Sequence, residues 1–150
     1  MKILINLLVF LGMAVYMEYV AWFTHKYVMH GFLWVLHEDH HRPRDRGLQK
    51  NDLFAVFFSL ASFVLIVSGL LRGAMPLVSA GLGMALYGIG YVLFHDVMFH
   101  RRIPGLRIRA QGRYLQRIVR AHKAHHQKGG RADNISFGFL YAPGKYDVSN

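Results

Sequence analysis

The sequence predicts an all-α integral membrane protein, with about three to four transmembrane helices and an amphipathic helix near the C-terminus. Three observations predict this fold class: long uncharged apolar segments, basic residues concentrated outside those segments, and histidines that recur at fixed spacings. Of the 150 residues 53% are hydrophobic, yet 18 are Lys or Arg and only 8 are Asp or Glu. A water-soluble domain rarely combines so apolar a composition with so one-sided a charge. We expect one membrane domain over residues 1–150.

Three apolar segments are each long enough to cross a bilayer as a helix. Residues 3–24 are interrupted only by Glu18, residues 53–71 carry no formal charge, and a third uncharged segment predicts a helix over 76–94. A hydrocarbon core of about 30 Å needs about 20 residues at a rise of about 1.5 Å each. The first segment is longer than the apolar core of a signal peptide, so we expect a retained helix.

The link between the second and third segments is short and ends in Pro76, a residue that suits the start of a helix. It predicts an antiparallel hairpin. Glycines in the third segment, Gly81, Gly83, Gly88 and Gly90, are expected to let helices pack closely, with clearance for a substrate as the less favoured alternative.

The basic residues predict how the chain is oriented. Three spans place residues 25–52 and 95–150 on the same side of the membrane, and sixteen of the eighteen Lys and Arg residues lie in these two stretches. Basic residues accumulate on the cytoplasmic side. We therefore expect the N-terminus outside and both stretches in the cytoplasm.

The second of these stretches contains the expected amphipathic helix. Within residues 106–126, Leu115, Ile118 and Val119 recur at helical spacing among several arginines. This pattern is typical of a helix that lies on an anionic membrane surface. Nucleic-acid binding is not expected, because three membrane spans already explain a one-sided basic surface.

All ten histidines fall into one pattern that occurs twice. An H-x4-H pair precedes an H-x2-H-H triplet in each half, and both halves begin where a membrane helix ends. The triplet places its histidines on one helical face, but an i, i+5 pair is about 140° apart on a straight α-helix. Such a pair serves one centre if the helix ends or bends, or else serves two metals. The histidines are His25, His30, His37, His40, His41, His95, His100, His122, His125 and His126.

This pattern predicts a histidine-rich site for two metal ions in two halves. The chain has no cysteine, so any metal must be bound through nitrogen or oxygen. Imidazole is a good ligand for iron, zinc, copper and nickel, and ten imidazoles suit two ions with four or five nitrogens each. Glu18 lies within the first span, seven residues before His25, and either orients that ring or makes an interhelical hydrogen bond. Asp96 is placed to accept a hydrogen bond from His95.

Parts of the same pattern also fit other functions. His37–His41 spells H-E-x-x-H, the signature of zinc proteases, in which Glu38 would be the general base. The second triplet has no glutamate, and a protease leaves most histidines unexplained. A membrane zinc protease is therefore the less favoured alternative, followed by a metal-binding or transport protein without catalysis. Haem ligation is weaker still, because haem prefers facing histidines deep within separate spans.

The chain resembles the fatty acid hydroxylase and desaturase superfamily of membrane di-iron oxidoreductases, and more closely the bacterial β-carotene hydroxylases. The resemblance extends over about residues 13–143 and includes stretches that hold no metal ligand. The stretches that carry it are His25-Lys-Tyr-Val-Met-His30-Gly31, Asn51-Asp52-Leu53, residues 91–96 and Ser136-Phe-Gly-Phe-Leu-Tyr-Ala-Pro143.

The resemblance implies hydroxylation at C3 of β-ionone rings, from β-carotene through β-cryptoxanthin to zeaxanthin, with canthaxanthin to astaxanthin as a further conversion. It also implies two iron ions, O2 as co-substrate, electrons from a ferredoxin-type donor, and the bacterial inner membrane. A carotenoid is insoluble in water, so its ring should enter sideways from the lipid bilayer. The histidine spacing alone leaves another membrane di-iron lipid hydroxylase or desaturase open.

Overall fold

The computed structural model describes residues 1–42, 47–127, 130–131 and 135–147, and every regular element within them is a helix. Two of these helices are π-helices (η1, η2) and one is a 3-10 helix (η3). In chain order the elements are α1 (Lys2–Phe23), η1 (Thr24–Phe32), α2 (Trp34–His41), α3 (Asp52–Leu71), α4 (Met75–Tyr91), η2 (Val92–Phe99), α5 (Gly112–Gln127) and η3 (Gly144–Tyr146).

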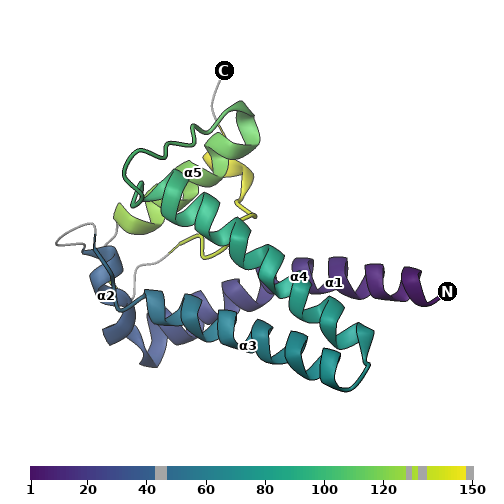
Figure 1. Cartoon of the computed structure of the whole chain (residues 1–150). Coiled ribbons are helices and arrows are strands. Elements are labelled where there is room, and N and C mark those ends of the chain that lie inside the picture. Colours follow the sequence, from purple (N-terminus) through teal and green to yellow (C-terminus); the bar gives the residue numbers. More distant parts are fainter. Residues whose placement is uncertain (43–46, 128–129, 132–134, 148–150) are drawn as a thin grey trace.

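Three helical segments are long and apolar enough to cross a membrane, namely Lys2–Phe32, Asp52–Leu71 and Met75–Phe99. The predicted fold class is thereby confirmed, with three spans (Figure 1). The first and third run further than the sequence predicted, because η1 continues α1 and η2 continues α4. His25, His30 and His95 consequently lie on helical extensions of the membrane helices, and His100 directly follows one.

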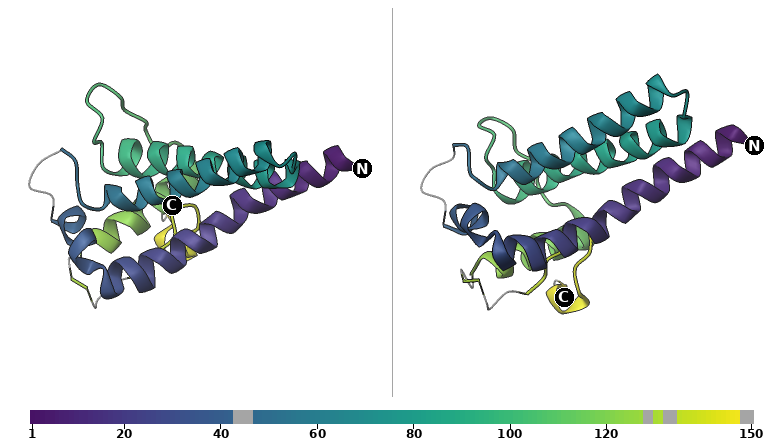
Figure 2. Two further views of the ribbon diagram at one scale, coloured as in Figure 1. Left: turned by 60° about the horizontal axis from the view of Figure 1, so that its bottom comes forward. Right: turned by 90° about the horizontal axis from the view of Figure 1, so that it is seen from below.

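α3 and α4 form the predicted antiparallel hairpin (Figures 1 and 2). The turn depends on Gly73, whose φ of +64° is a conformation that a side chain disfavours. The Ala74 N–H donates to the carbonyl of Gly69 at 2.8 Å and closes the end of α3. Pro76 occupies the first turn of α4, where its missing N–H costs no helical hydrogen bond.

Two of the four glycines in α4 allow the close helix packing that was predicted. A Cβ on Gly81 would lie 2.9 Å from the Ser62 carbonyl oxygen of α3, and a Cβ on Gly83 would collide with the Phe10 carbonyl oxygen of α1. The same prediction is wrong for Gly88 and Gly90, because no described heavy atom lies within 4 Å of a Cβ at either position. Figure 1 shows the reason, since α3 and α4 diverge with distance from their turn.

α5 is the amphipathic helix that the sequence predicted, but its apolar face packs on protein and not on a membrane surface. Ile118 and Ala121 are buried against Met98 of η2 and Ala142 of the C-terminal segment. Once this face is covered, the side that remains exposed carries charged residues such as Arg113 and Lys123. The packing holds α5 beside the end of the third span, and so places its histidines opposite those of η2.

Candidate metal centre

Nine histidines form two compact groups, and the tenth extends one of them. Within each group, ligand nitrogens lie within 4.8 Å of one another. His95 Nε2 lies 3.0 Å from His40 Nε2 and so makes a fifth member of the second group. The two groups adjoin, since the rings of His41 and His126 stack with centroids 4.4 Å apart. The first histidine group is His25, His30, His37, His41 and His125, and the second is His40, His95, His100, His122 and His126.

The π-helices bring together the H-x4-H pairs that a straight α-helix would separate. In a π-helix each N–H bonds to the carbonyl five residues earlier, so residue i+5 lies about one turn above residue i. The His100 N–H donates to the His95 carbonyl at 3.0 Å, and their ring centroids are 4.6 Å apart. His25 and His30 have centroids 5.1 Å apart in η1. Each pair thus serves one group through a change of helix type.

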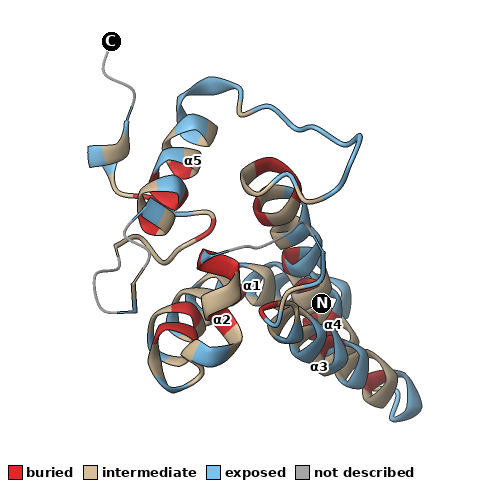
Figure 3. Cartoon of the chain, turned by 90° about the vertical axis from the view of Figure 1, so that its left-hand side faces the viewer, coloured by how far each residue is buried: buried red, intermediate tan, exposed pale blue. Residues whose placement is uncertain are grey.

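Each H-x2-H-H triplet divides its histidines between the two groups. The first and last histidine join the group of the π-helix that precedes them, whereas the middle one crosses to the other group. The middle residues are His40 of α2 and His125 of α5. The two groups therefore do not follow the two halves of the sequence, because successive residues such as His40 and His41 point about 100° apart around a helix. Figure 3 shows buried residues on both α2 and α5.

Five rings are oriented through Nδ1, which donates to a fixed oxygen and leaves Nε2 free to bind a metal. Such partners behind a ligand fix its tautomer and direction. Two of the acceptors are main-chain carbonyls and three are side chains, so the arrangement draws on several segments. The acceptors are Phe137 O for His25, Asn51 Oδ1 for His37, Gln49 Oε1 for His40, Asp96 Oδ1 for His95 and Ile135 O for His125, at 2.7–3.1 Å.

Sequence reasoning found only Asp96 among these acceptors. Asn51 belongs to a stretch that carries the family resemblance, which was the one available signal for it. Gln49 has no distinguishing sequence context. The carbonyls of Ile135 and Phe137 could not be found from sequence, because every residue has a carbonyl and only the path of the chain selects these two.

Arg102 connects the segment before α3 to the end of η2. Its guanidinium donates to both carboxylate oxygens of Asp52 at 2.6 and 2.7 Å, and to Asp96 at 3.4 Å. The same Asp52 accepts from the Gln49 N–H at 2.9 Å. One arginine therefore fixes the segment that supports His40 and the carboxylate that supports His95. It was not singled out from the sequence.

Glu18 makes the interhelical hydrogen bond that was one of its two expected roles, and it does not contact His25. Its Oε2 accepts from the Tyr87 hydroxyl of α4 at 2.7 Å. Its Oε1 accepts from three successive backbone N–H groups, residues 139–141, at 2.9–3.1 Å. Glu18 thereby anchors the C-terminal segment whose Phe137 carbonyl orients the His25 ring.

Burial keeps the histidines of both groups neutral. Desolvation, reinforced by neighbouring imidazoles, lowers the pKa of His41 to about 2 and the pKa of His100 to about 3. Desolvation likewise lowers the pKa of His40 to about 4, although its hydrogen bond to Gln49 acts in the opposite direction. Neutral imidazole is the form that binds a metal ion, so these rings are ready as ligands at neutral pH.

The arrangement of nitrogens fits metal ions. Nε2 atoms approach each other at 3.2 Å between His25 and His37 and at 3.2 Å between His30 and His125. Both partners of the first pair donate through Nδ1, so their facing Nε2 atoms are lone-pair acceptors that repel without a cation. Two nitrogens about 2.1 Å from one ion and at right angles are about 3 Å apart. Within the described residues, the buried His41 Nδ1 and His126 Nε2 also lack a hydrogen-bond partner.

The glutamate of the H-E-x-x-H match does not take part in either group. Glu38 is half-exposed and pairs at 3.1 Å with Arg42, the residue that follows α2. A zinc protease needs that carboxylate beside the metal-bound water, and the two histidines of the motif share their group with three others. The geometry therefore disfavours the protease alternative.

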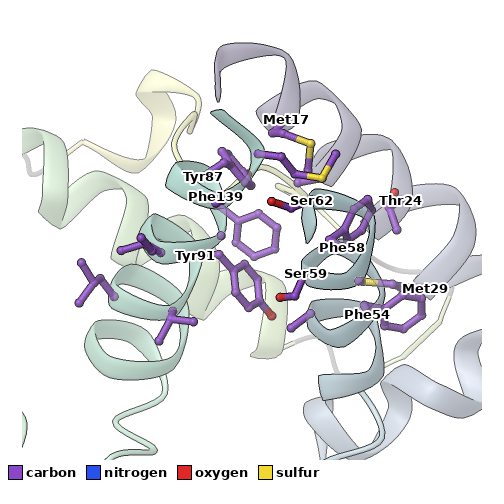
Figure 4. Close-up of a pocket in the computed structure, with 18 residues that line it drawn as sticks. Met17, Thr24, Met29, Phe54, Phe58, Ser59, Ser62, Tyr87, Tyr91 and Phe139 are labelled. Carbon is purple, nitrogen blue, oxygen red and sulfur yellow. The ribbon is translucent and has the colours of Figure 1, made fainter. Parts of the chain in front are cut away.

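An apolar pocket of about 490 Å³ adjoins the histidine groups within the span region (Figure 4). Its walls are the three spans, namely α1 continued by η1, then α3, and α4 continued by η2. Phe139 reaches it from the C-terminal segment. The pocket matches the volume range of about 300–1,000 Å³ that is typical of sites for small organic ligands.

Comparisons with known proteins agree with this picture. Residues 10–142 match the family described as fatty acid hydroxylase. "Beta-carotene hydroxylase" of Pseudescherichia vulneris is 45% identical, over 93% of this chain and 78% of its own, and that of Pantoea ananas is 43% identical, over 92% and 78%. The chloroplastic "Beta-carotene hydroxylase 1" of Capsicum annuum is 36% identical, over 88% of this chain and 42% of its own. No solved structure matches the chain.

Proposed function

Because the chain belongs to the fatty acid hydroxylase family, we propose that it is a β-carotene 3-hydroxylase. It converts β-carotene through β-cryptoxanthin to zeaxanthin, and canthaxanthin to astaxanthin. The observation that carries this proposal is the pair of buried histidine groups beside an apolar pocket, in a chain with β-carotene hydroxylases among its relatives. Inserting one oxygen atom of O2 into a C–H bond and reducing the other to water consumes two electrons and two protons.

We assign all ten histidines as ligands of two iron ions, five nitrogens from each group. Bound iron would supply the oxidising power that an unactivated C–H bond requires, which no side chain provides. Imidazole nitrogen suits iron, and the donor set of each group contains neither thiolate nor carboxylate.

The protein's own residues hold and orient the rings and exclude water. Asn51, Gln49 and Asp96 keep Nδ1 protonated on the rings they contact, so that Nε2 stays a lone-pair donor. The burial of His37, His40 and His125, each at most 2% exposed, keeps solvent from the groups. We assign no separate protein acid or base.

The electron donor and the orientation are part of the same proposal. A ferredoxin-type carrier is acidic, and a cytoplasmic surface rich in arginine would attract it electrostatically. Exposed Arg107, Arg109 and Arg113 belong to this surface. In the proposed orientation, the N-terminus lies outside and the histidine groups lie on the cytoplasmic side of a bacterial inner membrane, because basic residues accumulate on that side. Of the basic residues counted for it, Arg44, Arg46 and Lys128 lie outside the described residues.

The test is pigment chromatography of bacteria that accumulate β-carotene, with and without this chain. We expect β-cryptoxanthin and zeaxanthin in cells that express the chain. His40→Ala should abolish both products. The matched control is Lys123→Ala, which should leave product formation unchanged. Lys123 is exposed and lies between His122 and His125 of the second triplet.

Unaltered β-carotene despite membrane expression, bound iron and a supply of reductant would overturn the carotenoid assignment. In that case another lipid would be the substrate. One zinc per chain in place of iron, together with loss of function in Glu38→Ala alone, would instead favour the protease alternative.

A further inference from the structure

The pocket beside the histidine groups is made by the way α4 packs. Near the hairpin turn, glycines hold α4 against its neighbours, as at Gly81 against Ser62 of α3. Seven residues later, Gly88 lines the pocket with no described atom within 4 Å of its Cβ position. At Gly88 the absence of a side chain leaves open space between diverging helices. At Gly81, by contrast, it allows two helices to come into contact.

The pocket lies close to both the lipid of the bilayer and the histidine groups. Its α3 wall runs from Phe54 to Ser62, about the first 15 Å of that span at a rise of about 1.5 Å per residue. It thus occupies the half of the bilayer nearest the histidines. Ser59, Gly88 and Ile89 line it and are exposed, so the pocket is accessible from within a surrounding bilayer.

Two aromatic rings of the pocket lining, Tyr91 and Phe139 (Figure 4), also contact histidines of the two groups. Tyr91 stacks on His95 with centroids 4.4 Å apart, and Phe139 stacks on His25 at 5.5 Å. Phe139 also contacts His95, at 5.4 Å. One aromatic ring therefore separates the pocket from each histidine group.

The lining fits a hydrocarbon ring. No charged side chain is among the described residues that line the pocket. Two of its hydroxyl groups already have partners, since Ser62 donates to the Gly81 carbonyl at 2.8 Å and Tyr87 donates to Glu18 at 2.7 Å. An uncharged cyclic end group therefore leaves neither of these two hydroxyl groups unsatisfied.

We propose that this pocket receives the end ring of the carotenoid, which enters from the lipid past Gly88 and rests against Tyr91 and Phe139. The polyene chain extends back through the opening into the bilayer. This inference rests on the proposed function and adds the binding site and a residue that determines substrate entry. Gly88 is that residue, because any large side chain there would fill the opening.

The experiment compares Gly88→Leu with Gly90→Leu. Both substitutions place the same side chain on the same helix, where leucine favours helix formation over glycine. Both positions have space for it, but only Gly88 lines the pocket. Each variant is also made in the His40→Ala background, in which β-carotene that co-purifies with the detergent-solubilised chain measures binding without turnover.

We expect Gly88→Leu to lower both hydroxylated product and co-purified β-carotene by about tenfold or more through steric exclusion. Gly88→Ala should have a smaller effect, and Gly90→Leu should match the parent chain. Iron per chain should be equal in Gly88→Leu, Gly90→Leu and the parent, which separates a blocked pocket from a misfolded protein.

Unchanged product and pigment in Gly88→Leu would overturn the pocket assignment, as would an equal loss in Gly90→Leu. A failure of the proposed function looks different, because the unsubstituted chain itself would then form no hydroxylated carotenoid. If that chain is active and Gly88→Leu equals it, only the pocket assignment is wrong.

Discussion

At the scale of single residues, the metal centre depends on side chains that touch no metal. Asn51 is 2% exposed, and its Oδ1 lies 2.7 Å from His37 Nδ1. Its amide nitrogen reaches toward the Tyr91 hydroxyl at 3.4 Å, which joins it to the wall of the pocket. An asparagine in this place fixes a tautomer, and its removal should affect metal binding before it affects the fold.

We therefore expect Asn51→Ala to lower iron affinity by about 10–100-fold, the usual cost of losing a hydrogen-bond partner behind a ligand. Iron retained during titration with a chelator measures this. Asn51→Asp keeps an acceptor for the His37 N–H and should retain most of the affinity. Equal iron loss in both variants would contradict the role assigned to the acceptor.

Glu18 supports the centre from a greater distance. Glu18→Ala leaves three N–H groups of residues 139–141 and the Tyr87 hydroxyl without their acceptor, at a cost of about 1–3 kcal/mol for each group left buried and unpaired. We expect faster proteolysis of the C-terminal segment and reduced iron content. Glu18→Gln retains an amide oxygen for the N–H groups and is the control. If Glu18→Ala is cleaved no faster than the control, the segment is anchored by other contacts.

At the scale of elements, the π-helices are what the sequence could not reveal. The H-x4-H spacing was visible, and so was its conflict with a straight α-helix. Nothing in Thr24–Phe32 or Val92–Phe99 signals an i→i+5 hydrogen-bond pattern, because π-helices are rare and lack a strong residue preference. The triplets were easier, since i, i+3 and i, i+4 relations on α-helices are reliable. The assignment of His40 and His125 to the opposite groups could be found only from the tertiary structure.

The π-helical form of η1 leads to a prediction that the sequence spacing of His25 and His30 alone would not give. Exchanging two neighbours by His25→Lys and Lys26→His changes the spacing to His30 from five residues to four, at constant composition. On a straight α-helix this would align the pair, whereas on the π-helix η1 it moves the ring away from the first group. We expect the double variant to lose iron from that group, measured as iron per purified chain. Full iron content would indicate that η1 is α-helical.

At the scale of the whole molecule, the three spans and the amphipathic helix were predictable because long apolar segments and charge asymmetry are properties of composition. All three predicted spans are helical in the structure. The first helical segment extends eight residues beyond its predicted end, to Phe32, and the third extends five residues beyond, to Phe99, because the helices continue into polar sequence. The surface against which α5 packs was not predictable. An apolar stripe of helical period looks the same whether lipid or protein covers it.

The orientation can be checked with fusions. We expect green fluorescent protein joined after Asn150 to fluoresce, because it folds in the cytoplasm. Alkaline phosphatase inserted after Gly73, in the α3–α4 turn, should be active outside. Active alkaline phosphatase at the C-terminus would reverse the assignment.

Stability of the metal-free chain should fall in acid. Burial lowers the pKa of His40 to about 4 and the pKa of His125 to about 3, against about 6.5 in the unfolded chain. Below pH 6.5 the unfolded chain therefore binds more protons than the folded one. The free energy of unfolding should decrease by about 1.4 kcal/mol per pH unit for each histidine that stays neutral.

The measurement is denaturant unfolding in detergent with a chelator, at pH 7.5, 5.5 and 4.5. Stability should be highest at pH 7.5 and should decline through the range from about 6.5 to 4. A flat profile would mean that the rings are accessible to protons in the folded chain.

The exchange of His40 and His125 between the groups has a consequence for how the protein is made. As the chain leaves the ribosome, the first two-thirds can enter the membrane before α5 has been made. It then carries four histidines of the first group and three of the second. Only when His125 emerges with α5 does the first group become complete. In the proposed function, iron would therefore bind in full only after α5 has been made, and a chain truncated before α5 would lack ligands of both groups.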